Sequence, residues 1–353
     1  MFKNEKAITG IQDSKKQRDS NMELLRIMAM LLVLVVHSGF KSLGYPTTEE
    51  AITNPISIFM RYFVESMSII CVNVFILLSG WYGINVRKER FLAFVFQVLF
   101  FSVGIFLFHF IFSLPKISFD GIGSILALKG SDYWFVKAYI GLYILAPVLN
   151  SFVKNSSRKL FKVTLLAFFV FQSVYGWWTS GANWFEGGYS TFSFIGLYLL
   201  GRYVRLYSPH YTRFSYTIDF CIYCVLTFSL SAIGFLLTYF GHGLDHILFQ
   251  YTCPLVILSS LFFLLTFSKM NIKSKTINWI ASSSFAIYLL HTNRFIFDDI
   301  YCRQIALWSD KLDVSSFALY TILWITLFFF VAIIIDKIRI LCWNHILKIQ
   351  SQL

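Results

Sequence analysis

Runs of apolar residues, separated by short polar segments, recur from one end of the chain to the other. Each run is about twenty residues long, the length that a helix needs to cross a hydrocarbon core about 30 Å thick. The runs are continuous and do not alternate between apolar and polar positions, so they predict helices rather than the strands of a barrel. We expect ten spans, at about 22–40, 64–84, 91–113, 134–153, 163–179, 190–206, 216–240, 249–267, 277–292 and 314–335. The segment 55–63 is a candidate interfacial helix before the second span.

Composition agrees with this pattern. Of the 353 residues, 57% are hydrophobic and 14% are charged, and the mean hydropathy is +0.66. A soluble domain rarely combines such values. We therefore predict an all-α polytopic membrane protein, a bundle of about ten transmembrane helices. Its transmembrane domain would cover residues 22–335, between tails at 1–21 and 336–353.

The basic residues predict how the bundle is oriented. The formal net charge is +12, and in a membrane protein Lys and Arg mark the cytoplasmic loops rather than a nucleic-acid partner. If the N-terminus is cytoplasmic, 21 of the 30 Lys and Arg lie in inside segments and seven in outside loops. We therefore expect both termini to be cytoplasmic. No small-residue cleavage site follows the first span, so we expect it to be a retained signal-anchor.

The six cysteines indicate neither a disulfide framework nor a metal site. Most of them lie in apolar runs, where cysteine acts as a small hydrophobe. Cys221 and Cys224 have CxxC spacing, but they lie in a predicted span that offers no partner ligands. We expect no bound metal.

Two ionisable residues lie inside the first apolar run, Arg26 and His37. Eleven residues turn a helix by about 1100°, close to three full turns, so both side chains share one face, about 16 Å apart along the axis. Ionisable groups in a span usually face the bundle interior or a wet cavity.

Each of these two residues also has a structural interpretation. Arg26 can reach the interface and pair with Glu23, and His37 can be a packing residue. A neutral imidazole can instead act as a general base or a nucleophile, and the residues alone leave these roles open.

Arg87 and Arg90 lie in the short loop between the second and third predicted spans. Three residues apart, they would face the same way on a helical turn, and arginine forks suit phosphate groups. The alternative interpretation is an anchor that fixes topology.

These features resemble the membrane acyltransferase-3 family, and the resemblance covers nearly the whole chain. The matching segments are R-x10-H (Arg26 and His37), VNVFILLSGWYG (Val72–Gly83) followed by R-x-x-R (Arg87 and Arg90), YWFVKAYIGLYILAPVLN (Tyr133–Asn150), LGRYVR (Leu200–Arg205) and SSSFAIYLLH (Ser282–His291). One departure is visible. Family members often carry Asp-Gly-Leu-Arg, whereas this chain has Glu23-Leu24-Leu25-Arg26, and Glu23 is the candidate to replace the acid.

The resemblance implies an integral-membrane O-acyltransferase in the plasma (inner) membrane of a bacterium. Its donor would be cytoplasmic acyl-CoA, most simply acetyl-CoA, with no tightly bound cofactor. Its acceptor would be a sugar hydroxyl of an envelope glycan or a lipid-linked sugar. By the same resemblance, His37 and Arg26 inherit catalytic roles, and Arg87 and Arg90 inherit donor handling at the cytoplasmic face.

We further expect a passage through the bundle that links the donor to His37, because a base in the outer third of the membrane cannot otherwise meet a cytoplasmic thioester. Four more residues are candidates to line its acceptor side: Trp134, Lys137, Tyr139 and His291. Each has a simpler interpretation as an interfacial anchor or a packing residue.

The competing hypothesis is an exporter or flippase for a polysaccharide or its lipid-linked precursor, because the hydrophobic profile fits either class. The shared face of Arg26 and His37 and the Arg87/Arg90 loop favour an enzyme. The acyl group, the acceptor sugar and the oligomeric state stay open, including a homo-oligomer.

Overall fold

The computed structural model describes residues 19–113, 133–179, 181–243 and 245–350. Within these ranges the chain forms helices and turns, with no β-strand. The helices that build the bundle are α1 (Ser20–Ser38), α2 (Phe40–Leu43), α3 (Thr48–Thr53), α4 (Pro55–Ser68), α5 (Cys71–Tyr82), α6 (Lys88–Ser113), α8 (Trp134–Asn155), α9 (Arg158–Phe171), α10 (Thr191–Tyr207), α11 (Tyr216–Tyr239), α13 (Pro254–Ser268), α14 (Lys275–Ala281), α15 (Phe285–His291), α16 (Arg303–Lys311) and α17 (Val314–Gln350).

Seven helical segments of the described chain are long and apolar enough to cross a membrane. They are Ser20–Leu43, Pro55–Tyr82, Lys88–Phe112, Trp134–Asn155, Arg158–Trp178, Tyr216–Tyr239 and Val314–Ile349. The protein is thus an all-helical polytopic membrane protein. The expected 55–63 helix is the first part of α4, which begins with Pro55 in its first turn.

The other three predicted spans are shorter or interrupted. In place of the spans predicted at 190–206 and 249–267, the chain forms α10 (Thr191–Tyr207) and the 15-residue α13 (Pro254–Ser268). The helix predicted at 277–292 is divided into α14 and α15. Three consecutive serines make the break. The hydroxyls of Ser282 and Ser284 donate to the carbonyls of Trp279 (2.7 Å) and Ala281 (3.0 Å). Such side-chain bonds compete with helix formation. The count of ten spans stays a prediction.

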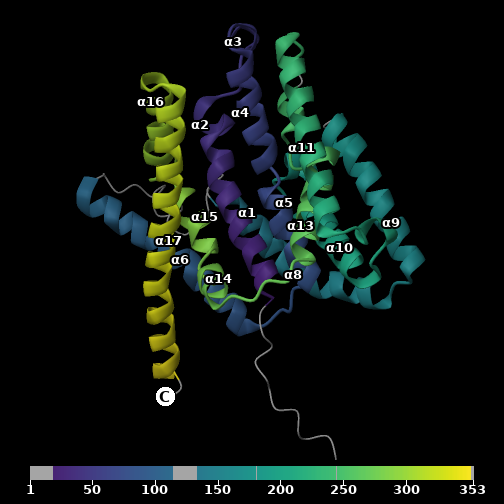
Figure 1. The fold of residues 1–353 in the computed structure, drawn as a ribbon. Helices are drawn as coiled ribbons and strands as arrows, with labels where there is room; N and C mark the ends of the chain where they lie inside the picture. The colour runs from purple at the N-terminus through teal and green to yellow at the C-terminus, as the bar shows by residue number, and fades with distance from the viewer. Residues whose placement is uncertain (1–18, 114–132, 180, 244, 351–353) are drawn as a thin grey trace, which may run out of the picture.

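Helix α1 lies at the centre of the bundle (Figure 1). It contacts α4, α5, α13, α14, α15 and α17, and its apolar residues are buried on several sides. A helix surrounded by other helices can carry polar side chains into the bundle interior without exposing them to lipid. This position makes α1 the element on which a buried site can be built.

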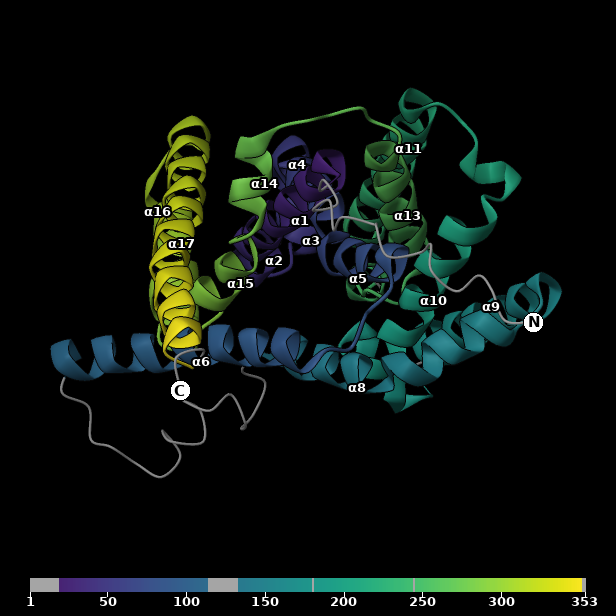
Figure 2. The same cartoon turned by 90° about the horizontal axis from the view of Figure 1, so that it is seen from below.

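The start of α1 and the end of α17 lie at the same end of the bundle, and α3 lies at the opposite end (Figure 1). Seen along the bundle, α6 and α8 extend as a nearly continuous line across one side (Figure 2). Residues 336–350, expected as a tail, continue helix α17. Residues 1–18 and 351–353 of the predicted tails lie outside the described residues, and the predicted orientation remains an expectation.

Helices α5 and α10 approach each other closely. A Cβ atom on Gly80 would lie 2.2 Å from the carbonyl oxygen of Tyr198, and one on Gly201 would lie 2.4 Å from that of Leu77. Glycines at such crossings let two backbones touch. The contact fixes the position of the end of α5, which leads into the loop 83–87 and then into α6.

Candidate active site

Two histidines from distant parts of the chain meet beside the end of α1. The Nδ1 atom of His37 lies 2.9 Å from Nε2 of His291, the last residue of α15. The Nδ1 atom of His291 lies 2.6 Å from the carbonyl oxygen of Ile287, one turn earlier in the same helix. The side chain of His291 is fully buried.

These contacts define the protons of both rings. A carbonyl oxygen only accepts, so Nδ1 of His291 carries a proton and donates it to Ile287. Burial favours the neutral imidazole, whose Nε2 is then a lone pair that accepts from Nδ1–H of His37. We therefore assign the lone pair of His37 to Nε2. Fixing one ring nitrogen through a bond at the other sets which nitrogen of a histidine is available for chemistry.

The turn that follows His37 is held from several sides. The hydroxyl of Ser42 donates to the carbonyl oxygen of His37 at 2.5 Å, and Oε2 of the buried Glu65 accepts from the amide of Phe40 at 3.1 Å. A Cβ atom on Gly39 would lie only 2.1 Å from Oε2 of Glu65. A side chain at this position would push the carboxyl group away from the Phe40 amide.

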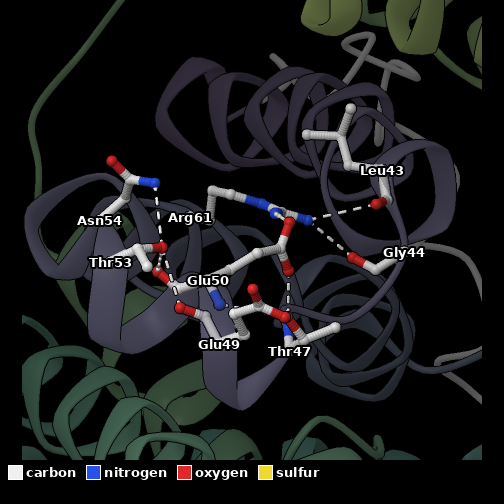
Figure 3. A network of polar contacts seen from close by, with 8 residues as sticks. All are labelled: Leu43, Gly44, Thr47, Glu49, Glu50, Thr53, Asn54 and Arg61. Atoms are coloured by element: carbon white, nitrogen blue, oxygen red, sulfur yellow. Dashed lines mark hydrogen bonds and ion pairs between the residues drawn. The ribbon is translucent and has the colours of Figure 1, made fainter.

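A network at the loop between α2 and α3 fastens the rest of this connection (Figure 3). Arg61 donates from Nη2 to the carbonyl oxygens of Leu43 (3.3 Å) and Gly44 (2.8 Å), and its Nη1 lies 3.9 Å from Oε1 of Glu50. Thr47 and Glu50 form a reciprocal capping box at the start of α3. The network ties α4 to the chain that leaves α1, which helps to hold His37 in place.

Arg26, near the start of α1, faces a different space. It lines a cavity of about 460 Å³ between α1, α5, α6, α8 and the α14–α15 break, together with Arg90 and several aromatic side chains. We call this the arginine cavity. Nη1 of Arg26 lies 2.7 Å from Oε2 of Glu23, so the pairing expected three residues apart is confirmed. Of the two ionic groups in that pair, only Arg26 lines the cavity.

His37 lines a second, much smaller space of about 20 Å³, which also touches Trp134, Cys71 and Tyr251. We call this the histidine chamber. Phe75 and Phe135 line both spaces, with ring centroids 5.5 Å apart. The expected single passage from Arg26 to His37 is thus two separate spaces in this structure, and we call the two rings that both spaces share, Phe75 and Phe135, the aromatic partition.

The remaining predicted site residues are distributed unevenly. Trp134 lines the histidine chamber, whereas Tyr139, five residues further along α8, lines the arginine cavity with its hydroxyl 3.4 Å from Oγ of Ser79. The expected acceptor-side group is thus divided between two spaces. Lys137 is half-buried and lines neither of them.

The side chains of Arg87 and Arg90 do not line the same space. Helix α6 begins at Lys88, so Arg87 precedes it, and its exposed side chain does not line the arginine cavity. The backbone of Arg87 is held instead, because its amide donates to the hydroxyl of Tyr143 (2.9 Å) and its carbonyl accepts from the same group (3.1 Å). Of these two arginines, only Arg90 lines the arginine cavity.

Sequence reasoning missed the aromatic partition and the bond between the two histidines. Phe75 and Phe135 lie in the segments VNVFILLSGWYG and YWFVKAYIGLYILAPVLN, so the signal was present in the motifs, but aromatic residues are too common in this chain to single out. The bond joins residues 254 positions apart, which no local spacing reveals.

The fold and these spaces define a polytopic membrane protein with a basic cavity at one end of its central helix and a buried histidine pair at the other. The chain belongs to the acyltransferase-3 family: the family's model, described as an acyltransferase domain, matches residues 19–337. It is therefore a membrane acyltransferase. Comparisons with curated proteins and with solved structures gave no significant match.

Proposed function

We propose that the protein transfers an acyl group, most simply acetyl, from acyl-CoA on the cytoplasmic side to a sugar hydroxyl of a cell-envelope glycan or its lipid-linked precursor. Membership of an acyltransferase family supports the reaction class. The observation that carries the mechanism is the bond from His37 to His291, which leaves Nε2 of His37 as the lone pair of a side chain that lines a chamber inside the bundle.

The chemistry begins at Nε2 of His37. As a general base, it takes the proton of the sugar hydroxyl while the oxygen attacks the thioester carbonyl, and the carbon–sulfur bond breaks to release the CoA thiolate. As a nucleophile, the same nitrogen first takes the acyl group and then passes it to the hydroxyl. In both routes the ring becomes cationic, and the bond to His291 keeps it oriented. His291 is then a positioning residue and does not touch the substrate.

The donor fits the arginine cavity. Arg90 and Arg26, the latter paired with Glu23, bring two guanidinium groups to its wall, and no carboxylate is among the described residues that line it. Such a site favours an anionic ligand, and CoA carries phosphates at one end of a long flexible arm. Since Phe75 and Phe135 close the way to His37, the proposed cycle requires these rings to move when the acyl end of the donor arrives.

The acceptor would approach His37 from the opposite, extracytoplasmic end, and the histidine chamber, which has room for about one water, would have to widen to admit a sugar. Trp134 lies at the chamber wall and packs against Tyr189 (4.5 Å between centroids) and Tyr251 (6.1 Å). Aromatic faces offer apolar area with a polar edge, which suits a sugar ring. This assignment places donor and acceptor on opposite sides of one aromatic partition.

The test is mass spectrometry of the envelope glycan from cells with and without the protein. We expect a full-length polymer that has lost ester-linked acyl groups when the gene is deleted. Restoration by the wild-type chain and not by His37→Ala would tie the loss to the site. A polymer that keeps its esters, or that is retained inside the cell, would contradict the proposal, and internal retention would identify an exporter.

A further inference from the structure

A third cavity, of about 710 Å³, adjoins the arginine cavity. The two spaces share one wall, formed by Tyr82, Gly83, Ile84 and Asn85. Arg202 of α10 and Lys154 of α8 line the third cavity, and no carboxylate is among its described lining residues. Its volume is in the range of about 300–1,000 Å³ that small-molecule sites have. We call it the α8–α10 cavity.

The shared wall is held in one conformation by bonds from both neighbouring helices. The amide of Ile84 donates to the hydroxyl of Tyr198 at 3.1 Å, and its carbonyl accepts from Nδ2 of Asn150 at 2.9 Å. The same hydroxyl of Tyr198 donates to Oδ1 of Asn150 at 2.6 Å. Because every polar atom of this clamp has a partner, the wall is preformed and costs little ordering when a ligand binds.

The guanidinium group of Arg202 can lie against this wall because Gly83 has no side chain. A Cβ atom on Gly83 would lie 3.1 Å from Nη1 and 3.3 Å from Cζ of Arg202, and Gly83 has φ +77°. The Nε atom of Arg202 is buried and has no hydrogen-bond partner among the described residues. A buried charged donor without an acceptor is unfavourable unless a ligand supplies the acceptor.

We propose that the α8–α10 cavity binds the 3′-phosphoadenosine end of CoA, with Arg202 and Lys154 on its 3′-phosphate. The diphosphate then lies at the shared wall, with Arg90 and Arg26 on its other side, and the acyl-pantetheine arm extends into the arginine cavity. This inference rests on the proposed function for the identity of the donor. It is carried by two adjoining basic cavities whose arrangement matches one elongated anionic ligand.

A substitution combined with a truncated donor tests this assignment. Purified protein in liposomes is assayed with acetyl-CoA and with acetyl-4′-phosphopantetheine, which lacks the nucleotide. Charge-assisted hydrogen bonds contribute enough for Arg202→Met to lower kcat/KM for acetyl-CoA by about tenfold or more. We expect kcat/KM for acetyl-4′-phosphopantetheine to be unchanged. Arg205→Met, which removes a charge from the same helix at a side chain stacked over Trp81, is the matched control and should leave the ratio of the two values unaltered.

Three outcomes would overturn the proposal. Equal losses with both donors would mean that Arg202 only supports the wall, and no loss with either would mean that it binds no donor. A loss confined to liposomes that contain phosphatidylglycerol would mean that the cavity holds an anionic lipid headgroup.

Binding measured without turnover separates this inference from the proposed reaction. Adenosine 3′,5′-bisphosphate should raise the Tm of the wild-type protein and of Arg205→Met, but not that of Arg202→Met. The same shift in all three proteins, or in none, would overturn the site. Such a shift can occur even if the purified protein acylates no glycan, so a failure of the reaction and a failure of the site give different results.

Discussion

The tautomer of His37 is set by its bond to His291, a residue of another helix. The carbonyl oxygen of Ile287 can only accept, so it places a proton on Nδ1 of His291. Nε2 of His291 then accepts from Nδ1–H of His37. A histidine whose Nδ1 is fixed in this way presents Nε2 without sampling the other tautomer. We therefore propose that His291, expected from the sequence on the acceptor side, supports His37 instead.

Replacing His291 tests that assignment. His291→Leu removes the acceptor for Nδ1–H of His37, so we expect kcat for acyl transfer to fall about 10- to 100-fold while KM for the donor changes little. His291→Gln keeps an acceptor oxygen and should retain more of the activity. Steady-state kinetics of both variants, with Tm as a check on folding, give the answer. Full kcat in a folded His291→Leu protein would exclude the supporting role.

For single residues, the sequence predicted contacts between close neighbours in the chain but not contacts between distant segments. The spacing of Arg26 and Glu23 is set by the helix repeat, so their ion pair could be predicted. The partner of His37 depends on how α15 packs against α1, and the guanidinium of Arg202 on a glycine in the loop 83–87. Neither follows from residue spacing.

Between the helices, Phe75 and Phe135 line both spaces, and we propose that these rings control access to the histidine chamber. Phe75→Ala removes one of the two shared rings, so we expect water and acyl-CoA to reach His37 more easily. Hydrolysis of acetyl-CoA without any acceptor should then rise several-fold in proteoliposomes, because water can replace the sugar hydroxyl.

Phe108→Ala is the control for this variant, since the Phe108 ring is exposed on α6 and lines neither space. Its rate of hydrolysis should equal that of the wild type. If Phe75→Ala also hydrolysed acetyl-CoA at the wild-type rate, the partition would not be the barrier.

The close crossing of α5 and α10 is a second contact between helices that a substitution can test. Gly201→Ala would place a methyl group against the backbone of α5, so we expect a loss of about 1–3 kcal/mol in stability, seen as a lower Tm in detergent. Gly104→Ala is matched to it, because a Cβ atom there meets nothing within 4 Å. That variant should be as stable as the wild type or slightly more so. An unchanged Tm for Gly201→Ala would show that the helices are not in close contact.

Helix existence was predictable from apolar runs, but helix ends and breaks were not. Hydropathy averages over a window, so the break at Ser282–Ser284 and the extension of α17 through 336–350 were both missed. The first turn of the extension is held by polar contacts, whereas most of its later residues are exposed. Asp336 is buried, accepts two bonds of 2.9 Å from Arg339 and accepts one of 2.8 Å from Gln97 of α6.

For the molecule as a whole, the start of α1 and the end of α17 lie at the same end of the bundle (Figure 1). Together with the distribution of Lys and Arg, this predicts that both termini are cytoplasmic. Green fluorescent protein fused after Leu353 should fluoresce, and alkaline phosphatase fused there should be inactive. Fusions in the loop after Leu43 should behave in the opposite way. The reverse pattern would invert the assignment of donor and acceptor sides.

The most direct test of the central claim is acyl transfer by the purified protein in liposomes. Radiolabelled acetyl-CoA is supplied on one side and the envelope glycan on the other, and the wild type is compared with His37→Ala and with His345→Ala, whose side chain is exposed on α17. We predict that His37→Ala lowers the rate of labelled glycan formation by about 10²-fold or more, while His345→Ala keeps the wild-type rate. A folded His37→Ala protein that acylates the glycan at the wild-type rate would contradict the account.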